Sequence, residues 1–240
     1  MTGIFKTLSP DWKIPNVKAY TILATATDSS PVSFGQFTPL DSECRKKLET
    51  LLNPVFPMNW LRQVHGNHIV ELPLIQGTIL EADGSCTHQK RTICTVITAD
   101  CLPIVFSTHD GTQVGVAHAG RKGLQNGILH EMIKKFNVHS DEIYVWIGPG
   151  IAAQSYPVSL EIKVEVLALS SAYEKVFTVG EQGQILMDLY EVARIQLLHH
   201  GILKNHIYGA EWNTFTDNRL HSARRDKELS GRMATVVWME

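Results

Sequence analysis

The chain has 240 residues, of which 44% are hydrophobic and 19% charged, and its formal net charge is −2. These values are ordinary for a globular protein with a sizeable core, and they exclude the basic excess that nucleic acid or an anionic membrane attracts. No apolar run reaches the roughly 18 residues of a membrane-spanning helix, and no secretory leader is evident, so a cytoplasmic protein with reduced cysteines is expected.

The first half of the chain is predicted to contain a loop, a helix and several short strands. Segment 27–42 is rich in Ser, Pro and Asp, which is typical of a loop. A helix is expected over 42–53, with Ser42 as its N-cap and Pro54 beyond its end. Runs rich in Val, Ile and Thr then predict strands at residues 68–75, 92–99, 102–108 and 113–119.

The second half is predicted to be more helical. Apolar residues at every fourth position, from Leu124 to Phe136, predict a helix over 122–136. Further elements are a strand over 142–150 that ends in a Gly-Pro-Gly turn, helices at 160–173 and 187–201, and a strand at 233–239. We therefore expect an α+β fold: a single domain spanning 1–240, with mixed α/β layers and helices covering the sheets.

A hairpin between two predicted strands suggests a functional site. Asp110-Gly111 lies between these strands and favours a two-residue type I′ turn. In that register Pro103 faces His118, so Cys101 and His118 become diagonal neighbours on one face, roughly 7–8 Å apart. A metal can bridge such a gap, but a slip of one residue would place the two side chains on opposite faces.

A third ligand has to come from elsewhere in the chain. His65, in the polar loop LRQVHGNH, is the best candidate, and His68 is the alternative. Each residue also has a plain structural interpretation, because a cysteine is often a small buried hydrophobe and a histidine a hydrogen-bonded core residue. Two histidines and one thiolate suit zinc, and three protein ligands leave a position open, as in catalytic sites.

Six segments together resemble one known family. They are RQVHG (62–66), ADG (82–84), TADCLPIVF (98–106), VGVAHAG (114–120), IGPGI (147–151) and the tail SARRDKELSGRMATVVWM (222–239). In this order they are similar to the YfiH family, also called the polyphenol-oxidase or laccase-domain family. The resemblance runs from about residue 60 onward. Single motifs are weak, but their order and number make the set specific.

The resemblance implies one domain of mixed α/β layers that binds zinc through His65, Cys101 and His118. It also implies phosphorolysis of adenosine, inosine and methylthioadenosine, together with deamination of adenosine. Some bacterial members have been given an editing role in cell-wall precursor synthesis. Phosphorolysis needs an anion site and contacts to the base and ribose. Candidates for the anion site are Arg62, Arg121 and Arg225, and candidates for the base or ribose are Asp83 and Asp100.

Three departures from the family pattern bear on substrate choice and rate. The expected TR-x-GG-like stretch is ATATDSSPVSFG here and lacks the Arg. The usual HAGW appears as HAGR, ending at Arg121, and the usual Cys-Thr-Tyr appears as Asn213-Thr214-Phe215. None of these changes touches the three expected zinc ligands.

Other functions compete with this interpretation. In a thiol hydrolase, Cys101 would be the nucleophile and His118 its base. A copper polyphenol oxidase is disfavoured because the sequence has no H-x-H pair, and one thiolate with two spaced histidines cannot build a multi-copper cluster. A non-catalytic binding protein on the same scaffold is the fourth possibility. The sequence does not reveal the oligomeric state.

Overall fold

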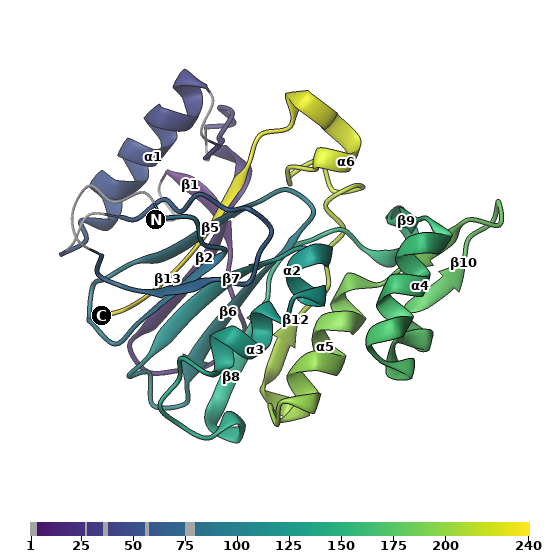
Figure 1. The fold of residues 1–240 in the computed structure, drawn as a ribbon. Helices are drawn as coiled ribbons and strands as arrows, with labels where there is room; N and C mark the ends of the chain where they lie inside the picture. Colours follow the sequence, from purple (N-terminus) through teal and green to yellow (C-terminus); the bar gives the residue numbers. More distant parts are fainter. Residues whose placement is uncertain (1–3, 27, 36–37, 56–57, 75–79) are drawn as a thin grey trace.

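The computed structural model describes residues 4–26, 28–35, 38–55, 58–74 and 80–240 (Figure 1). Within them the strands form three sheets. A four-stranded sheet has the order β1 (Phe5–Leu8), β2 (Val17–Ala26), β13 (Met233–Met239), β5 (Cys94–Thr98). A six-stranded sheet has the order β12 (Ile207–Gly209), β8 (Ile143–Ile147), β6 (Leu102–Thr108), β7 (Val114–Ala119), β4 (Gly84–Thr87), β3 (Ile69–Glu71). A small sheet has the order β10 (Phe177–Val179), β11 (Ile185–Met187), β9 (Pro157–Val158).

The helices cover the two larger sheets and the small sheet. Their bounds are α1 Pro39–Leu52, α2 Arg121–Gln125, α3 Ile128–Ile133, α4 Leu160–Leu169, α5 Leu189–His199 and α6 Ala223–Asp226. Short 3-10 turns occupy Ser140–Glu142, Ala153–Ser155, Ser171–Val176, Lys204–His206 and Lys227–Leu229. Among the helices that the structure describes, none is long and apolar enough to cross a membrane.

The core is layered because strand side chains alternate between the two faces of a sheet. In β6, Ile104 and Phe106 pack with the residues of α3 and α5, whereas Val105 packs with the four-stranded sheet. Figure 1 shows α2, α3 and α5 along one side of the six-stranded sheet, and α1 lies against the far side of the four-stranded sheet. The order is therefore helix, sheet, sheet, helices. The expectation of mixed layers with helices covering the sheets is confirmed.

The helix expected over 42–53 begins earlier than predicted. Thr38 is the N-cap: its side chain accepts the Asp41 N–H, and the Asp41 side chain accepts the Thr38 N–H. Pro39 fits the first turn, where its missing N–H costs nothing. Ser42 is thus inside the helix, and its prediction as N-cap was wrong. The predicted loop 27–42 ends correspondingly earlier, and its residues 27 and 36–37 lie outside the described residues.

The helix expected over 122–136 is broken into two pieces. Gly127 adopts a left-handed φ of 79° between α2 and α3, which glycine reaches without steric cost. The predicted apolar stripe is nevertheless buried, since Leu124, Ile128, Met132 and Phe136 all belong to the core. The periodicity therefore predicted the buried face of the helix correctly, but it wrongly predicted one continuous helix.

The register of the predicted hairpin is confirmed, but its turn is not. Leu102 pairs with Ala119 and Pro103 with His118, as the sequence predicts. Residues 109–112 form the connection, and Gly111 alone of the central pair has a positive φ, at 68°. A type I′ turn would need positive φ at both positions. The longer loop is symmetric about the same centre, so the strands keep the predicted pairing.

Candidate metal centre and its cavity

The candidate site lies where the chain passes from one large sheet to the other. Strand β5 ends at Thr98 in the four-stranded sheet, and β6 begins at Leu102 in the six-stranded sheet. Residues 99–101 cross between them, and Asp100 adopts a positive φ of 86° at this crossing. Such a backbone is uncommon for a residue with a side chain and persists only where the surroundings fix it.

Three potential ligands converge at this crossing. The ligand atoms of His65, Cys101 and His118 all lie within 4.8 Å of one another. The two imidazole rings are 4.7 Å apart between centroids and nearly perpendicular. This set can hold one metal ion, because thiolate sulfur and imidazole nitrogen are both zinc ligands. The alternative ligand His68 instead bonds through Nδ1 to the Glu81 carbonyl at 3.0 Å.

Gly120 is required for this close approach. A Cβ at position 120 would lie 2.7 Å from the Cys101 sulfur and 3.3 Å from the His65 ring. Any larger residue would push the thiol or the imidazole out of position. The glycine that follows His118 and Ala119 therefore has a steric role in the site.

The buried Asp83 carboxylate holds both histidines in place by hydrogen bonds. Its side chain is fully buried, and its Oδ1 accepts the His118 Nδ1–H at 2.8 Å and the His65 N–H at 2.9 Å. Its Oδ2 accepts the N–H groups of Val64 and Gly66. These bonds hold His65 in a left-handed backbone with φ 62°. They also leave His118 Nε2 as the nitrogen available to a metal, the arrangement in which a carboxylate orients a metal-binding histidine.

The thiol of Cys101 differs electrostatically from those of the three buried cysteines, Cys44, Cys86 and Cys94. Burial raises its pKa, but the His118 and His65 rings outweigh burial and lower the pKa to about 6. Burial, with a smaller contribution from the Glu71 charge, raises the pKa of Cys86 to about 12. Burial lowers the pKa of His118, whereas the Cys101 thiolate and Asp83 raise it, and the result is about 9. The site thus favours a thiolate, the form that binds metals.

A cavity of about 800 Å³ opens over the three ligands. Its lining includes the end of β5 and, from the C-terminal part of the chain, Ala223, Arg224, Lys227 and Arg232. The charged side chains of that lining, apart from the ligands, are Arg62, Arg224, Lys227, Arg232 and Asp100. Among the described residues the cavity is therefore net cationic, which suits an anionic substrate. We call Arg224, Lys227 and Arg232 the cationic wall.

Two of the arginines predicted to bind an anion are already paired with acids. Arg62 lines the cavity but forms an ion pair with Glu81 at 3.2 Å, and its side chain is 66% exposed. Arg121 does not line the cavity; it bonds to the Gln125 side chain and pairs with Glu165 at 3.5 Å. The structure thus brings only Arg62 of these two to the cavity.

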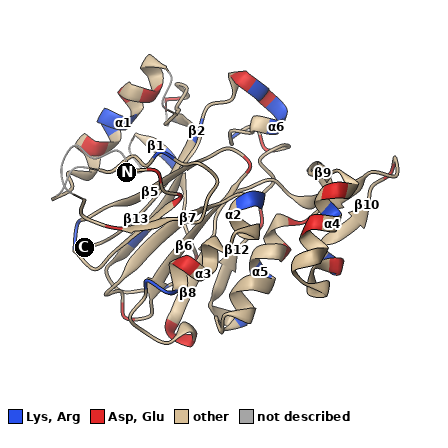
Figure 2. Ribbon diagram, in the orientation of Figure 1, with Lys and Arg blue, Asp and Glu red and all other residues tan. Residues whose placement is uncertain are grey.

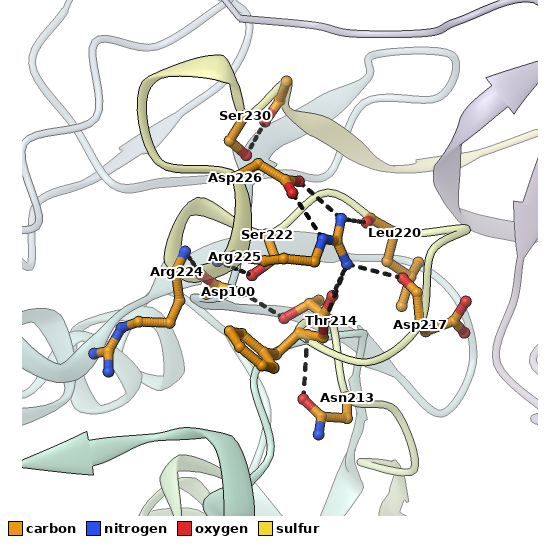
Figure 3. Close-up of polar contacts among 12 residues, drawn as sticks. Asp100, Asn213, Thr214, Asp217, Leu220, Ser222, Arg224, Arg225, Asp226 and Ser230 are labelled. Carbon is orange, nitrogen blue, oxygen red and sulfur yellow. Dashed lines mark hydrogen bonds and ion pairs between the residues drawn. The ribbon is translucent and has the colours of Figure 1, made fainter.

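Arg225 is a structural residue rather than an anion contact. Its guanidinium pairs with the Asp226 carboxylate and donates to the carbonyls of Thr214 and Leu220 (Figure 3). The Asp226 carboxylate, followed by Asp100 and Asp217, raises the pKa of Arg225, and the hydrogen bonds tie the C-terminal segment together. Figure 3 shows Arg224, its neighbour in sequence, extending away from this network. The expectation of an anion site at Arg225 is corrected for this reason.

The two predicted acidic contacts also have internal partners. Asp83 is sealed behind the histidines and does not line the cavity, so its position does not support a contact to base or ribose. Asp100 lines the cavity, but its Oδ1 accepts the Thr214 hydroxyl at 2.6 Å and its Oδ2 the Arg224 N–H at 2.6 Å. Both oxygens of Asp100 therefore accept hydrogen bonds from within the protein.

The cationic wall and Thr98 were missed as site residues in the sequence. Arg224, Lys227 and Arg232 all lie in the tail segment 222–239 that carries the family resemblance, but no role was predicted for them. The available signal was the density of basic residues in SARRDKELSGR, which Figure 2 shows as adjacent blue and red positions around α6. Only the fold brings this segment to the cavity, about 160 residues after His65.

Fold and site together define a class: a mixed α/β protein with a His-Cys-His candidate metal site in a cationic cavity. A family model described as multi-copper polyphenol oxidoreductase laccase matches residues 42–240. The chain therefore belongs to this laccase-domain family, also known through its YfiH members, and the sequence resemblance is confirmed.

Individual relatives support this assignment. A Haemophilus influenzae protein named purine nucleoside phosphorylase is 33% identical over 97% of this chain and 99% of its own length. A Shigella flexneri protein named purine nucleoside phosphorylase YfiH is 31% identical over 98% of this chain and 99% of its own. A crystal structure of a Neisseria meningitidis protein superposes with a TM-score of 0.88 at 28% identity, covering 98% of this chain and 99% of that one.

Proposed function

We propose that this protein is a zinc-dependent purine nucleoside phosphorylase that acts on adenosine, inosine and methylthioadenosine and also deaminates adenosine. One observation carries the proposal: the three convergent ligands lie in a net cationic cavity of about 800 Å³. That volume lies within the range of small-molecule sites, roughly 300–1,000 Å³. The names of the relatives supply the reaction class.

The donor set favours zinc over copper. Two imidazoles and one thiolate bind either metal, but blue-copper sites add a weak axial ligand, usually methionine. No methionine lines the cavity among the residues that the structure describes. Within the same residues, His65, Cys101 and His118 are the single cluster of this kind, and a multi-copper oxidase needs more ligands than these.

The residues of this chain then have separate tasks. A bound zinc ion would supply a Lewis acid with an open coordination position. His65, Cys101 and His118 would hold it, and Asp83 keeps His118 oriented. In phosphorolysis a phosphate oxygen attacks ribose C1′ while the bond from C1′ to the purine nitrogen breaks, and the purine leaves with that electron pair and takes up a proton. The cationic lining would offset the charge of the phosphate.

The products distinguish the two activities. Pure metal-loaded protein should convert adenosine to adenine and ribose 1-phosphate only when phosphate is present. Deamination consumes water instead, so inosine and ammonia should form with or without phosphate. If neither product set appeared with any of the three nucleosides, the proposed function would be contradicted.

A second candidate rests on the same cluster. Cys101 has a lowered pKa and lies beside His118, the arrangement of a thiol nucleophile and its base. In that case a metal would be unnecessary for turnover. The presence of a second histidine and of the orienting Asp83 favours metal binding, because a Cys–His pair needs only one imidazole.

A further inference from the structure

We propose that the cationic wall, together with the Thr98 hydroxyl, is the binding site for inorganic phosphate. This inference rests on the proposed function, since phosphorolysis requires phosphate as a co-substrate. It assigns the anion to Arg224, Lys227 and Arg232 rather than to the arginines that the sequence motifs suggest.

The first argument is that the cationic wall has no internal counter-charge. Among the described residues, Arg224, Lys227 and Arg232 form no ion pair, whereas Arg62, Arg121 and Arg225 each pair with an acid. The acid that lines the cavity is occupied, since both oxygens of Asp100 accept hydrogen bonds, and Asp226 pairs with Arg225. Three cations gathered at one cavity repel one another, and an anion between them removes that repulsion.

The second argument is that the arginines are held in place and keep free donors. The Arg224 guanidinium lies 5.1 Å from the Tyr156 ring centre and donates to the Pro157 carbonyl at 3.4 Å, and the Arg224 backbone N–H donates to Asp100. Arg232 donates from one terminal nitrogen to the carbonyls of Ser230 and Gly231. A guanidinium has five N–H donors in a planar fork that matches phosphate oxygens, so donors remain on both residues.

The third argument is an unsatisfied hydroxyl in the same cavity. Thr98 is 1% exposed, lines the cavity, and its Oγ1 has no hydrogen-bond partner among the described residues. The register of β5 with β13 pairs Thr98 with Met233, so Thr98 is adjacent to Arg232. A buried hydroxyl without a partner is costly, and it could donate a hydrogen bond to a phosphate oxygen. Thr92 has a similarly orphaned hydroxyl but does not line the cavity.

The test measures phosphate binding separately from turnover. Phosphate affinity would be measured by calorimetry on the metal-loaded protein, and the Michaelis constants for phosphate and nucleoside by product formation. Arg232→Gln and Arg224→Gln should each weaken phosphate binding about tenfold, the effect of losing one charge-assisted hydrogen bond. Thr98→Val should weaken it several-fold without lowering thermal stability, since the hydroxyl has no internal partner to lose.

Matched controls are present in the chain. Arg219→Gln removes an exposed arginine that pairs with Asp217 away from the cavity, and Thr92→Val removes the other orphaned threonine hydroxyl. Both should leave phosphate affinity unchanged. If Arg232→Gln does not fold, Lys227→Gln takes its place, because Lys227 is exposed and has no ion pair among the described residues.

The outcomes separate this inference from the proposed function. Phosphate binding that depends on the cationic wall, in a protein that cleaves no nucleoside, would support the site and contradict the function. Nucleoside phosphorolysis with phosphate affinity unchanged in folded Arg224→Gln, Arg232→Gln and Thr98→Val would overturn the site and leave the function standing.

Discussion

The three candidate metal ligands (the metal cluster) and the cationic wall share one cavity, and a buried acid supports each of them. The two acids differ in whether they bond to side chains or to the backbone of the residues they support. Asp83 bonds directly to the imidazole of His118 and to three consecutive amides around His65. Asp100 accepts hydrogen bonds from the Arg224 backbone N–H and the Thr214 hydroxyl, and it does not bond to the Arg224 side chain. Asp83 therefore orients a ligand side chain directly, whereas Asp100 fixes only the backbone at Arg224, and the wall's arginine side chains are placed by other contacts.

The largest expected effect is the loss of metal in Cys101→Ala. Wild-type protein should carry about one zinc ion per chain, and the variant should lose most of it, because thiolate sulfur is the charged ligand of the set. Elemental analysis of the purified proteins measures this. The matched controls Cys44→Ala, Cys86→Ala and Cys94→Ala should each keep the ion. Equal zinc in wild type and Cys101→Ala would refute the assignment.

A comparison of two histidines in one loop comes next. His65→Ala should abolish nucleoside turnover and release metal, because His65 is the member of the loop that reaches Cys101 and His118. His68→Ala should keep a substantial part of the activity, since His68 bonds only to the Glu81 carbonyl. Steady-state rates and zinc content would be measured together. The opposite pattern would transfer the ligand role to His68.

Substitution of the two buried acids tests the contrast between the metal cluster and the wall. Asp83→Asn should reduce zinc affinity by about 10–100-fold, the usual cost of losing the carboxylate behind a metal-binding histidine. Asp100→Asn should keep zinc and instead raise the Michaelis constant for phosphate. Competition with a chromogenic chelator gives the first quantity, and initial rates give the second. Equal zinc loss in both variants would contradict the assignment of Asp83 to the metal ligands and of Asp100 to the cationic wall.

The reactivity of Cys101 separates metal binding from thiol catalysis. In chelator-treated protein, Cys101 should react with iodoacetamide at neutral pH and more slowly as pH falls below about 6, where the thiolate takes up a proton. Cys86 should stay unreactive, because burial raises its pKa to about 12. Metal-loaded protein should react much more slowly, and chelation should abolish turnover until zinc is restored. Fast alkylation with full activity in chelator would instead support a thiol hydrolase.

Sequence reasoning brought the three candidate ligands together, whereas it did not assemble the cavity around them. Cys101 immediately precedes β6 and His118 lies on β7 of the same hairpin, so local pairing rules place them together, and the motif HGNH supplied the third residue. Thr98, Arg224 and Arg232 come together only because β13 pairs with β5, a contact between distant parts of the chain. Nothing in the local pattern of either segment indicates that pairing, and the wall was missed for this reason.

Errors in the predicted elements have similar causes. Gly127 could have indicated the helix break, because glycine readily adopts a positive φ. The regular spacing of apolar residues on both sides of it instead predicted one continuous helix. Strand β4, Gly84–Thr87, is too short and too polar to be found from pattern, and its place is set by pairing with β7. Strand β2, Val17–Ala26, carried a usable apolar signal that the prediction did not exploit.

The position of β13 has a consequence for biosynthesis. Residues 233–239 form an interior strand, bonded to β2 on one side and to β5 on the other. During translation, β2 and β5 emerge long before their shared neighbour, so the four-stranded sheet stays open until the ribosome has passed residue 239. A nascent chain halted before that point exposes two unpaired strand edges, the surfaces that chaperones shield and that aggregation exploits. Premature termination should therefore yield insoluble fragments, not partly active enzyme.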